Sequence, residues 1–238
     1  MKENLLPWEN AVVTGASYGI GRAMAIGFAR KGCNLILIGR NKKGLEETAE
    51  RVRKEGRKVK VFALDLTNYN DLRKIFNQVN NVSVLYNGVA NWVEKKLIQV
   101  SPKEIEETVD AVYKANIFAT KFFLPFLIKS KGAIINMVSD WGLPDAKTPA
   151  LFGSAKNALS IFGSLLREEL KDKRVRIINV YPAEVSSSLD IDNPTQEDKK
   201  IRLSDLISAI LRVFDSEREN VKNIMVSNLT NKLNVKYL

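Results

Sequence analysis

The residue types missing from this chain limit the chemistry that it can perform. The 238 residues include no histidine and a single cysteine, Cys33. Without histidine there is no Ser-His-Asp triad, no Cys-His pair, and no histidine acid–base or metal chemistry. One cysteine also excludes an internal disulfide framework and a cysteine-based zinc site. Any reaction must therefore use Ser, Tyr, Lys, Asn or carboxylate side chains, or a bound cofactor, and no metal site is expected.

A glycine-rich segment, TGASYGIG at positions 14–21, follows the first apolar run. Glycines at such a turn let the backbone approach a pyrophosphate, which then lies at the positive N-terminus of the next helix. A glycine-rich turn without a ligand is the plain alternative. The strand–turn–helix context favours a dinucleotide site. The residues expected around the phosphates are Gly15, Ser17, Tyr18, Gly19, Ile20 and Gly21.

The charge points to an anionic partner, since 37 basic residues outnumber 27 acidic ones and give a net charge of +10. That partner is a nucleic acid, a lipid surface or a phosphorylated small molecule. Nucleic acid is disfavoured because aromatic residues do not alternate with basic ones along the chain. No apolar run reaches the roughly 18 residues of a membrane span, and the N-terminus does not read as a signal peptide. We therefore expect a cytoplasmic protein without a membrane or nucleic-acid partner.

Apolar runs alternate along the chain with amphipathic helical stretches. Strands are predicted at 11–13, 34–38, 59–64, 82–86, 133–138, 175–180 and 223–226, and helices at 19–31, 42–55, 68–79, 102–128, 152–171 and 203–214. Pro125 is expected to kink or end the long fourth helix. Strands that are apolar on both faces and separated by helices indicate a parallel sheet covered on both sides. The chain, 1–238, is predicted to be a single doubly wound, Rossmann-type α/β domain of about seven strands.

The spacing Thr-Gly-x-x-x-Gly-x-Gly differs from the G-x-G-x-x-G of most dinucleotide folds. It resembles the short-chain dehydrogenase/reductase family, and the resemblance extends from about residue 9 to about residue 215. The resemblance implies an oxidoreductase of the 3-oxoacyl-reductase-like kind that acts on a small carbonyl or alcohol. It also implies a homodimer or homotetramer, with Leu159, Phe162 and Leu166 of the sixth helix facing a second copy. An apolar stripe of this kind that belongs to the core is the alternative.

The end of the second predicted strand bears on the choice of cofactor. Proteins that prefer NAD usually place an acidic residue there to bind the ribose 2′-hydroxyl. Here Gly39 leaves room and Arg40 offers a guanidinium fork for a 2′-phosphate, with Asn41 beside it. A solvated, basic helix start is the alternative. The sequence predicts NADP(H), the choice of family members with this pattern.

The resemblance places further residues against the cofactor. Asp65 and Leu66 match the pair beside the adenine, although an Asp that ends a strand before a helix cap at Thr67 or Asn68 is a common local arrangement. Asn87 matches the first residue of the family's Asn-Asn-Ala-Gly, whereas the glycine has moved to Gly88. The sequence departs again where Pro182-Ala183 replaces Pro-Gly. Val185 and Ser187 complete the set expected near the nicotinamide, at the start of a variable substrate loop over about 183–202.

The family's catalytic set is Asn, Ser, Tyr and Lys. Asn116, Ser139 and Lys156 match three of its members in order and spacing. The tyrosine position, thirteen residues after Ser139 and four before Lys156, is occupied by Phe152. The tyrosine donates a proton to the carbonyl oxygen, and the lysine lowers its pKa and holds the ribose hydroxyls. Phe152 lacks that donor.

Two interpretations of Phe152 remain open. In the first, the enzyme has weakened or rewired proton transfer, with Asp140, Asp145, Tyr181 or Glu184 as possible substitute donors. A carboxyl group would need a raised pKa to act near neutral pH. In the second, the protein binds NADP(H) without catalysis and serves as a sensor or partner subunit.

Overall fold

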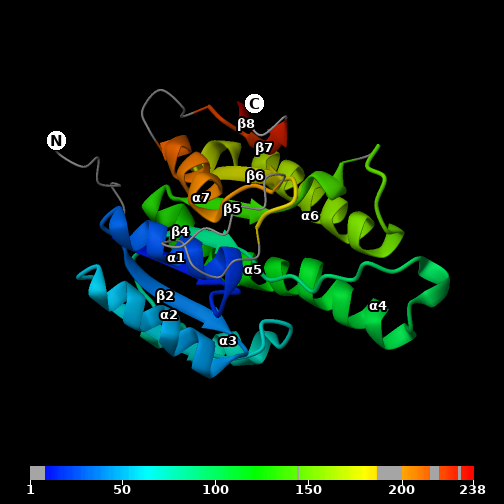
Figure 1. Ribbon diagram of the computed structural model, residues 1–238. Coiled ribbons are helices and arrows are strands. Elements are labelled where there is room, and N and C mark those ends of the chain that lie inside the picture. Colours follow the sequence, from blue (N-terminus) through cyan, green and yellow to red (C-terminus); the bar gives the residue numbers. More distant parts are fainter. Residues whose placement is uncertain (1–8, 144, 187–199, 215–219, 230–231) are drawn as a thin grey trace.

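The computed structural model describes residues 9–143, 145–186, 200–214, 220–229 and 232–238. Its strands form one sheet in the order β3-β2-β1-β4-β5-β6-β7-β8, parallel except for β8, which runs antiparallel to β7 (Figure 1). The strands are β1 (Asn10–Thr14), β2 (Asn34–Gly39), β3 (Val59–Ala63), β4 (Val82–Asn87), β5 (Ala133–Met137), β6 (Arg176–Pro182), β7 (Asn223–Leu229) and β8 (Lys232–Tyr237). The predicted doubly wound α/β fold is confirmed.

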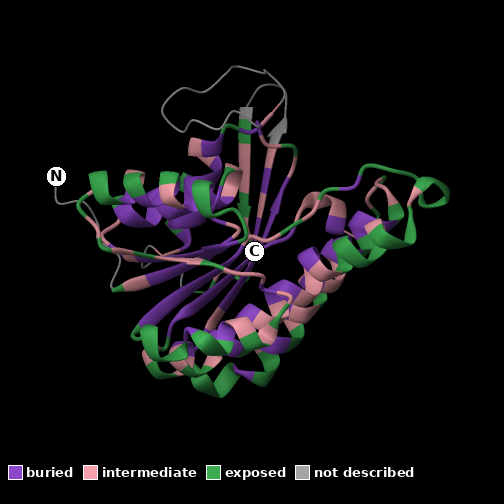
Figure 2. Cartoon of the chain, turned by 90° about the horizontal axis from the view of Figure 1, so that it is seen from below, coloured by how far each residue is buried: buried purple, intermediate pink, exposed green. Residues whose placement is uncertain are grey.

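Helices cover both faces of the sheet. The elements are α1 (Gly19–Arg30), α2 (Lys42–Lys54) and α7 (Leu203–Leu211) on one face, and α3 (Tyr69–Lys74), α5 (Ala115–Ser130) and α6 (Ala150–Glu169) on the other. Helix α4 (Pro102–Val109) extends beyond the sheet (Figure 1). Figure 2 shows buried strands between helices whose outer surfaces are exposed.

Each strand contributes to two separate cores because successive side chains point to opposite faces. In β1, Ala11 and Val13 pack in the core under α1 and α7, while Val12 packs in the core under α5. Both faces of the strand are therefore apolar, as the sequence predicts for a parallel sheet.

The strand β8 was not predicted. Its sequence, KLNVKY, alternates polar and apolar residues, and it covers the outer edge of β7. An antiparallel edge strand of this kind needs only a short connection from β7. The sheet therefore has eight strands rather than about seven.

The long fourth helix differs from the prediction. A π-helical turn, η3 (Asp110–Lys114), separates α4 from α5. Pro125 does not end α5, which continues to Ser130, because Phe123 and Leu127 on either side of the proline are fully buried. The third helix is shorter than predicted, since α3 ends at Lys74 and a 3₁₀ turn, η1 (Phe76–Gln78), follows.

The stretch Pro102–Ser130 is also long and apolar enough to cross a membrane, by length and composition alone. Half of its most apolar window is buried inside the fold. The core helix of a soluble protein passes the same test, so the stretch is weak evidence for a membrane span.

The apolar stripe expected on α6 to face a second copy belongs largely to the core. Leu159 and Leu166 are buried, and Phe162 packs against the core beneath α5. The apolar side chains of α6 that face outward are instead Ile161, 52% exposed, and Leu165, 61% exposed. The stripe therefore fits the core alternative, and any contact with a second copy would use the other two residues.

Candidate active site

The sequence-predicted residues gather at one edge of the sheet, where the parallel strands end. In open α/β sheets this edge is where ligands bind. The glycine-rich turn follows β1, Arg40 follows β2, and Gly88 follows β4. Ser139 follows β5, and Ala183 follows β6. The fold thus brings segments that are far apart in sequence to one place.

The glycine-rich turn is held by close backbone contacts. Gly15 has φ +68°, and a Cβ there would lie 2.8 Å from the carbonyl oxygen of Gly88. A Cβ on Gly21 would lie 2.1 Å from the carbonyl oxygen of Gly15. The turn therefore needs glycine at both positions.

The other residues of the turn differ in exposure. Ser17 is buried, Ile20 is partly buried, and Gly19 has φ +57° with open space around it. The exposed Tyr18 is the N-cap of α1 and makes no side-chain cap.

Arg22, which the sequence analysis missed, holds this turn through hydrogen bonds to backbone carbonyl oxygens. Its guanidinium is buried and donates to the carbonyl oxygens of Ser17, at 2.6 Å, and Gly44, at 3.2 Å. It also pairs with Glu47 at 2.8 Å and donates to Thr48 Oγ1 at 3.0 Å. Arg22 thereby joins the turn to α2. The pattern that could have revealed it is an arginine inside the apolar face of the first helix.

The end of β2 lies against the turn. A Cβ on Gly39 would lie 3.0 Å from Ser17 Oγ, so glycine keeps this approach open. The next residue, Arg40, is exposed, and within the described part of the chain its guanidinium has no hydrogen bond or ion pair. Asn41 caps α2 by accepting a hydrogen bond from the backbone N–H of Gly44 at 3.1 Å. Arg40 is thus available to an anion, while the Oδ1 of Asn41 is engaged in the helix cap.

The Asp65 side chain makes local contacts. Its carboxylate accepts hydrogen bonds from the backbone N–H of Thr67 at 2.9 Å and from the Thr67 hydroxyl at 2.8 Å. This fits the alternative of a strand-end Asp before the helix cap, and Asn68 is the N-cap of α3. Leu66 beside it is buried in the core under α5.

A row of asparagine side chains crosses the buried sheet. Asn87, Asn136 and Asn179 are aligned on β4, β5 and β6. Asn87 Nδ2 donates to Asn136 Oδ1 at 2.9 Å, and Asn136 Nδ2 donates to Asn179 Oδ1 at 3.0 Å. Asn87 also donates to Thr120 Oγ1 at 2.9 Å. The structure therefore ties the amide of Asn87 into the sheet. We call these three residues the asparagine row.

Asn116 lies directly after the π-helical turn. Its side-chain Nδ2 donates to the carbonyl oxygen of Val112 at 2.8 Å and to that of Val89 at 3.0 Å. It thus bridges the irregular helix and the segment after β4. Its Oδ1 is buried and has no hydrogen-bond partner among the described residues. Turns of this type occur often at functional sites.

Ser139 lies just beyond the end of β5. Its Oγ is 3.1 Å from Asp140 Oδ1 and accepts a hydrogen bond from the backbone N–H of Trp141 at 3.2 Å. Burial raises the pKa of the Asp140 carboxyl, although its hydrogen bonds with Ser139 and with the backbone N–H of Trp141 oppose this. The Ser139 hydroxyl is therefore hydrogen-bonded to the Asp140 carboxyl, which takes up a proton more readily than an ordinary aspartate does.

Phe152 and Lys156 lie one helical turn apart on α6. The Lys156 ammonium nitrogen lies 5.6 Å from the centroid of the Phe152 ring and donates to the carbonyl oxygen of Met137 at 2.7 Å. Only 4% of Lys156 is exposed, and burial lowers its pKa to about 7. The side chain one helical turn from Lys156 is therefore an apolar ring.

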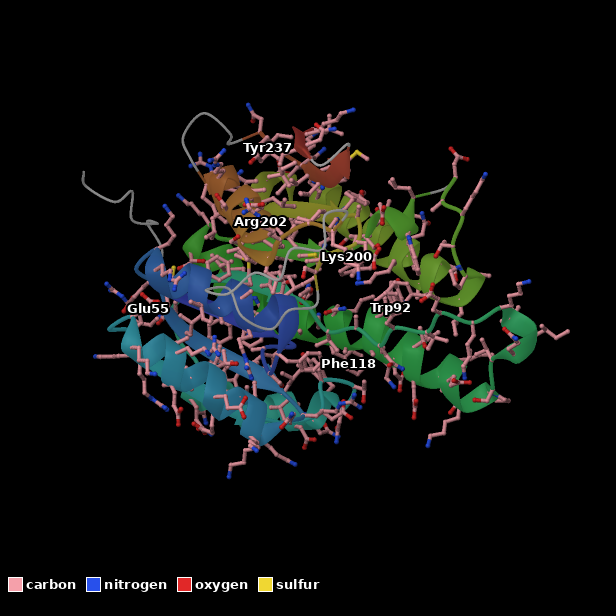
Figure 3. The ribbon with its side chains drawn as sticks, in the orientation of Figure 1. Glu55, Trp92, Phe118, Lys200, Arg202 and Tyr237 are labelled. Carbon is pink, nitrogen blue, oxygen red and sulfur yellow. The ribbon has the colours of Figure 1, made fainter. Side chains whose placement is uncertain are left out.

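Two indole rings extend this aromatic surface outward. Trp141 contacts Phe152 edge to face, with 6.1 Å between ring centroids, and Trp92 contacts Trp141 in the same way at 5.8 Å. Trp92, labelled in Figure 3, lies between β4 and α4 and is 60% exposed. The sequence analysis did not single out either tryptophan, because neither belongs to a spaced motif.

The residues after β6 are partly described. Pro182 is buried, and Ala183 donates its backbone N–H to the carbonyl oxygen of Val226 at 2.8 Å. Val185 forms a parallel bridge with Ile201. Ser187 and most of the expected substrate loop lie outside the described residues. Among the described residues, no group of three or more His, Cys, Asp or Glu side chains is placed to hold a metal ion.

Comparison with known proteins places this arrangement in a family. Residues 9–198 match the family model described as short chain dehydrogenase. An uncharacterised oxidoreductase of Staphylococcus epidermidis is 27% identical over 203 residues, which cover 84% of this chain and 88% of the relative.

Two solved structures show the same fold. An alcohol dehydrogenase from the archaeon Thermococcus sibiricus, complexed with 5-hydroxy-NADP, has a TM-score of 0.82 at 24% identity and covers 92% of this chain and 96% of that one. The L-sorbose reductase from Gluconobacter frateurii, complexed with NADPH and L-sorbose, has a TM-score of 0.83 at 18% identity, with coverage of 97% and 99%. The chain belongs to the short-chain dehydrogenase/reductase family and is an oxidoreductase of that type.

Proposed function

We propose that this protein is an NADP(H)-dependent oxidoreductase of the 3-oxoacyl-reductase-like kind that interconverts a small carbonyl compound and its alcohol. Its proton transfer is weakened because Phe152 occupies the position of the tyrosine acid. The observation that carries the proposal is the placing of Lys156 over the Phe152 ring on α6, with Ser139 at the end of the neighbouring strand. The catalytic frame is therefore present without the phenolic hydroxyl.

The cofactor side of the site fits a phosphorylated dinucleotide. A Cβ would close the backbone cradle at Gly15 and Gly21, and the Arg40 guanidinium faces solvent beside that cradle. The two solved relatives named above are complexed with an NADP derivative and with NADPH, which supports the same cofactor here. When bound, NADPH supplies a hydride. Its proposed phosphate, ribose and adenine contacts are Gly15, Ser17–Gly21, Arg40, Asn41, Asp65, Leu66, Asn87 and Gly88.

The chain's own residues provide the remaining chemistry. The Ser139 hydroxyl is proposed to orient and polarise the carbonyl oxygen, and Lys156 to hold the nicotinamide ribose. Pro182, Ala183, Val185 and Ser187 are proposed to bound the nicotinamide, and the loop 183–202 to bound the substrate. The lost tyrosine acid is worth about 10²–10⁴-fold in rate, or roughly 3–5 kcal/mol of barrier.

We also propose that the chain works as a single domain, in the cytoplasm, and as a homodimer or homotetramer. Two outward apolar residues of α6, Ile161 and Leu165, support contact with a second copy. Large apolar side chains are costly to leave in water.

A titration of NADPH and NADH, followed by turnover with a panel of ketones, tests this function. We expect tighter binding of NADPH, then slow reduction of at least one ketone. Failure to bind either nucleotide refutes the proposal. Binding without turnover favours the second candidate function, a silent NADP(H)-binding protein that serves as a sensor or partner subunit. Phe152 is the observation that keeps this second candidate in view.

A further inference from the structure

The geometry around Ser139 points to a proton relay that replaces the missing tyrosine. We propose that the Asp140 carboxyl, acting through the Ser139 hydroxyl, supplies the proton that the carbonyl oxygen receives. This inference rests on the proposed function, since it concerns the same reaction. Ser139 touches the substrate in this scheme, and Asp140 acts through it.

The hydrogen bonds of Ser139 allow such a relay. A serine hydroxyl has one hydrogen to donate and two lone pairs to accept with. One lone pair accepts the backbone N–H of Trp141 at 3.2 Å. When Asp140 is protonated, its O–H can donate to the second lone pair across the 3.1 Å contact. The serine hydrogen is then free for the carbonyl oxygen. When Asp140 is ionised, it attracts that hydrogen to itself instead.

A cavity that Asp140 helps to line, with Ala183, Met225 and Val226 among its apolar residues, gives space for the water that would return a proton. The cavity has a volume of about 150 Å³, enough for several water molecules. Beside Asp140, its polar lining comes from β6, β7 and β8 and consists of Tyr181, Ser227, Asn234 and Lys236. Asp140 therefore lies between Ser139 and a space that can hold water.

The charged groups around Asp140 come from several elements. Lys236 of β8 lines the same cavity and is exposed. Lys156 of α6 is held on the Met137 carbonyl oxygen, and Glu184 pairs with Lys200 at 3.2 Å. The Tyr181 hydroxyl is 2.6 Å from Ser160 Oγ, so it has a partner of its own. None of these described groups forms an ion pair with Asp140, and its burial favours the protonated form.

The step balances in protons and electrons. NADPH, when bound, would supply the hydride and both electrons to the carbonyl carbon, and would itself be oxidised. The Ser139 O–H bond breaks as its proton forms a bond to the carbonyl oxygen. The Ser139 oxygen takes the Asp140 proton, and a solvent proton passed on by water in the cavity restores the Asp140 carboxyl. The net reaction consumes that solvent proton and would yield the alcohol and NADP⁺.

Asp140→Asn tests the relay, with Asp145→Asn as the matched control, because Asp145 is an exposed aspartate of the same loop. We expect NADPH to bind all three proteins equally. The kcat of the unmodified enzyme should fall as pH rises through the pKa of Asp140. Asp140→Asn should remove that pH dependence and lower kcat by about 10²-fold, the low end of acid catalysis. Asp145→Asn should change neither kcat nor its pH dependence.

The same substitution in a Phe152→Tyr background separates a relay from a structural role. With a tyrosine acid present, loss of Asp140 should leave kcat nearly unchanged. A structural defect would instead lower kcat by the same factor with and without Phe152→Tyr. Infrared difference spectra of the unmodified protein against Asp140→Asn provide a readout without turnover. They should show a carboxyl that titrates above the usual aspartate value of about 3.9.

Several outcomes overturn the relay. One is a pH profile that Asp140→Asn does not alter, and another is an equal loss in the Phe152→Tyr background. A third is NADPH binding without any turnover in the unmodified protein. The first two outcomes leave turnover intact, so they are distinguishable from failure of the proposed oxidoreductase function, which appears as absence of nucleotide binding or of turnover.

Discussion

Phe152→Tyr is the most direct perturbation of this site, because it adds a single hydroxyl at the position proposed to lack the tyrosine acid. Phe152 is 8% exposed and lies between the Trp141 ring and the Lys156 ammonium. Lys156 is positioned to stabilise the phenolate and so lower the new tyrosine's pKa. A tyrosine acid is worth about 10²–10⁴-fold and the proposed Asp140 relay about 10²-fold, so we expect reduction of a ketone by NADPH to rise by up to about 10²-fold.

The effect of Phe152→Tyr on stability depends on the surroundings of the new tyrosine oxygen. If it reaches the carbonyl pocket, the substitution costs little stability. A buried hydroxyl without a partner would instead cost about 1–3 kcal/mol. Urea unfolding measured beside the NADPH oxidation assay distinguishes the two results.

Phe152→Tyr combined with Lys156→Ala is the control. The gain should disappear, because the tyrosine then lacks the neighbouring charge. Binding of NADPH has to be measured for each variant, since Lys156 is also proposed to hold the ribose. The reasoning is refuted if Phe152→Tyr binds NADPH and shows no gain with any of several ketones, since the pocket would then not admit a carbonyl.

Three other predictions follow from described residues. Arg40→Asp should invert the preference for NADPH over NADH, and equal affinities in the unmodified protein, measured by fluorescence titration, would contradict the role of Arg40. Ile161→Glu with Leu165→Glu should convert an oligomer into a monomer in light scattering, and a monomeric unmodified protein would disprove the contact. Burial lowers the pKa of Lys156 to about 7, so the unfolded chain binds one more proton than the native chain between about pH 7 and pH 10. Native stability should therefore rise with pH in this window, by roughly 1.4 kcal/mol per pH unit; Lys156→Met should lack this component when unfolding free energies are compared.

The fold could be predicted because its signals are local and repeated. Apolar runs such as 34–38 recur at regular intervals between helical stretches, which requires a parallel sheet. The strand β8 was missed because its alternating residues stabilise an edge only after β7 exists. The π-helical turn was not predicted, and the contact of Asn116 with Val89 beside it joins segments that are distant in sequence.

The site could be predicted only where a residue belongs to a spaced motif. The positions of Ser139, Phe152 and Lys156 follow from their spacing, and the fold brings them together. Arg22 and Trp92 were not found, because their contacts join segments that are distant in sequence. Asp140 was among several candidate donors, and its contact with Ser139, its burial and the cavity beside it distinguish it from the exposed Asp145.

The asparagine row has a consequence for how this protein can change over time. A Cβ on Gly163 of α6 would lie 2.3 Å from Asn179 Oδ1, so the helix rests directly on the row. A shift of one residue between β5 and β6 would unpair buried amides, which is costly. The asparagine row thus fixes the register of the strands and the position of α6 on the sheet, and neither depends on the side chain at position 152. Such a scaffold tolerates exchange of its acid while retaining the geometry, so activity can be lost or regained without refashioning the fold.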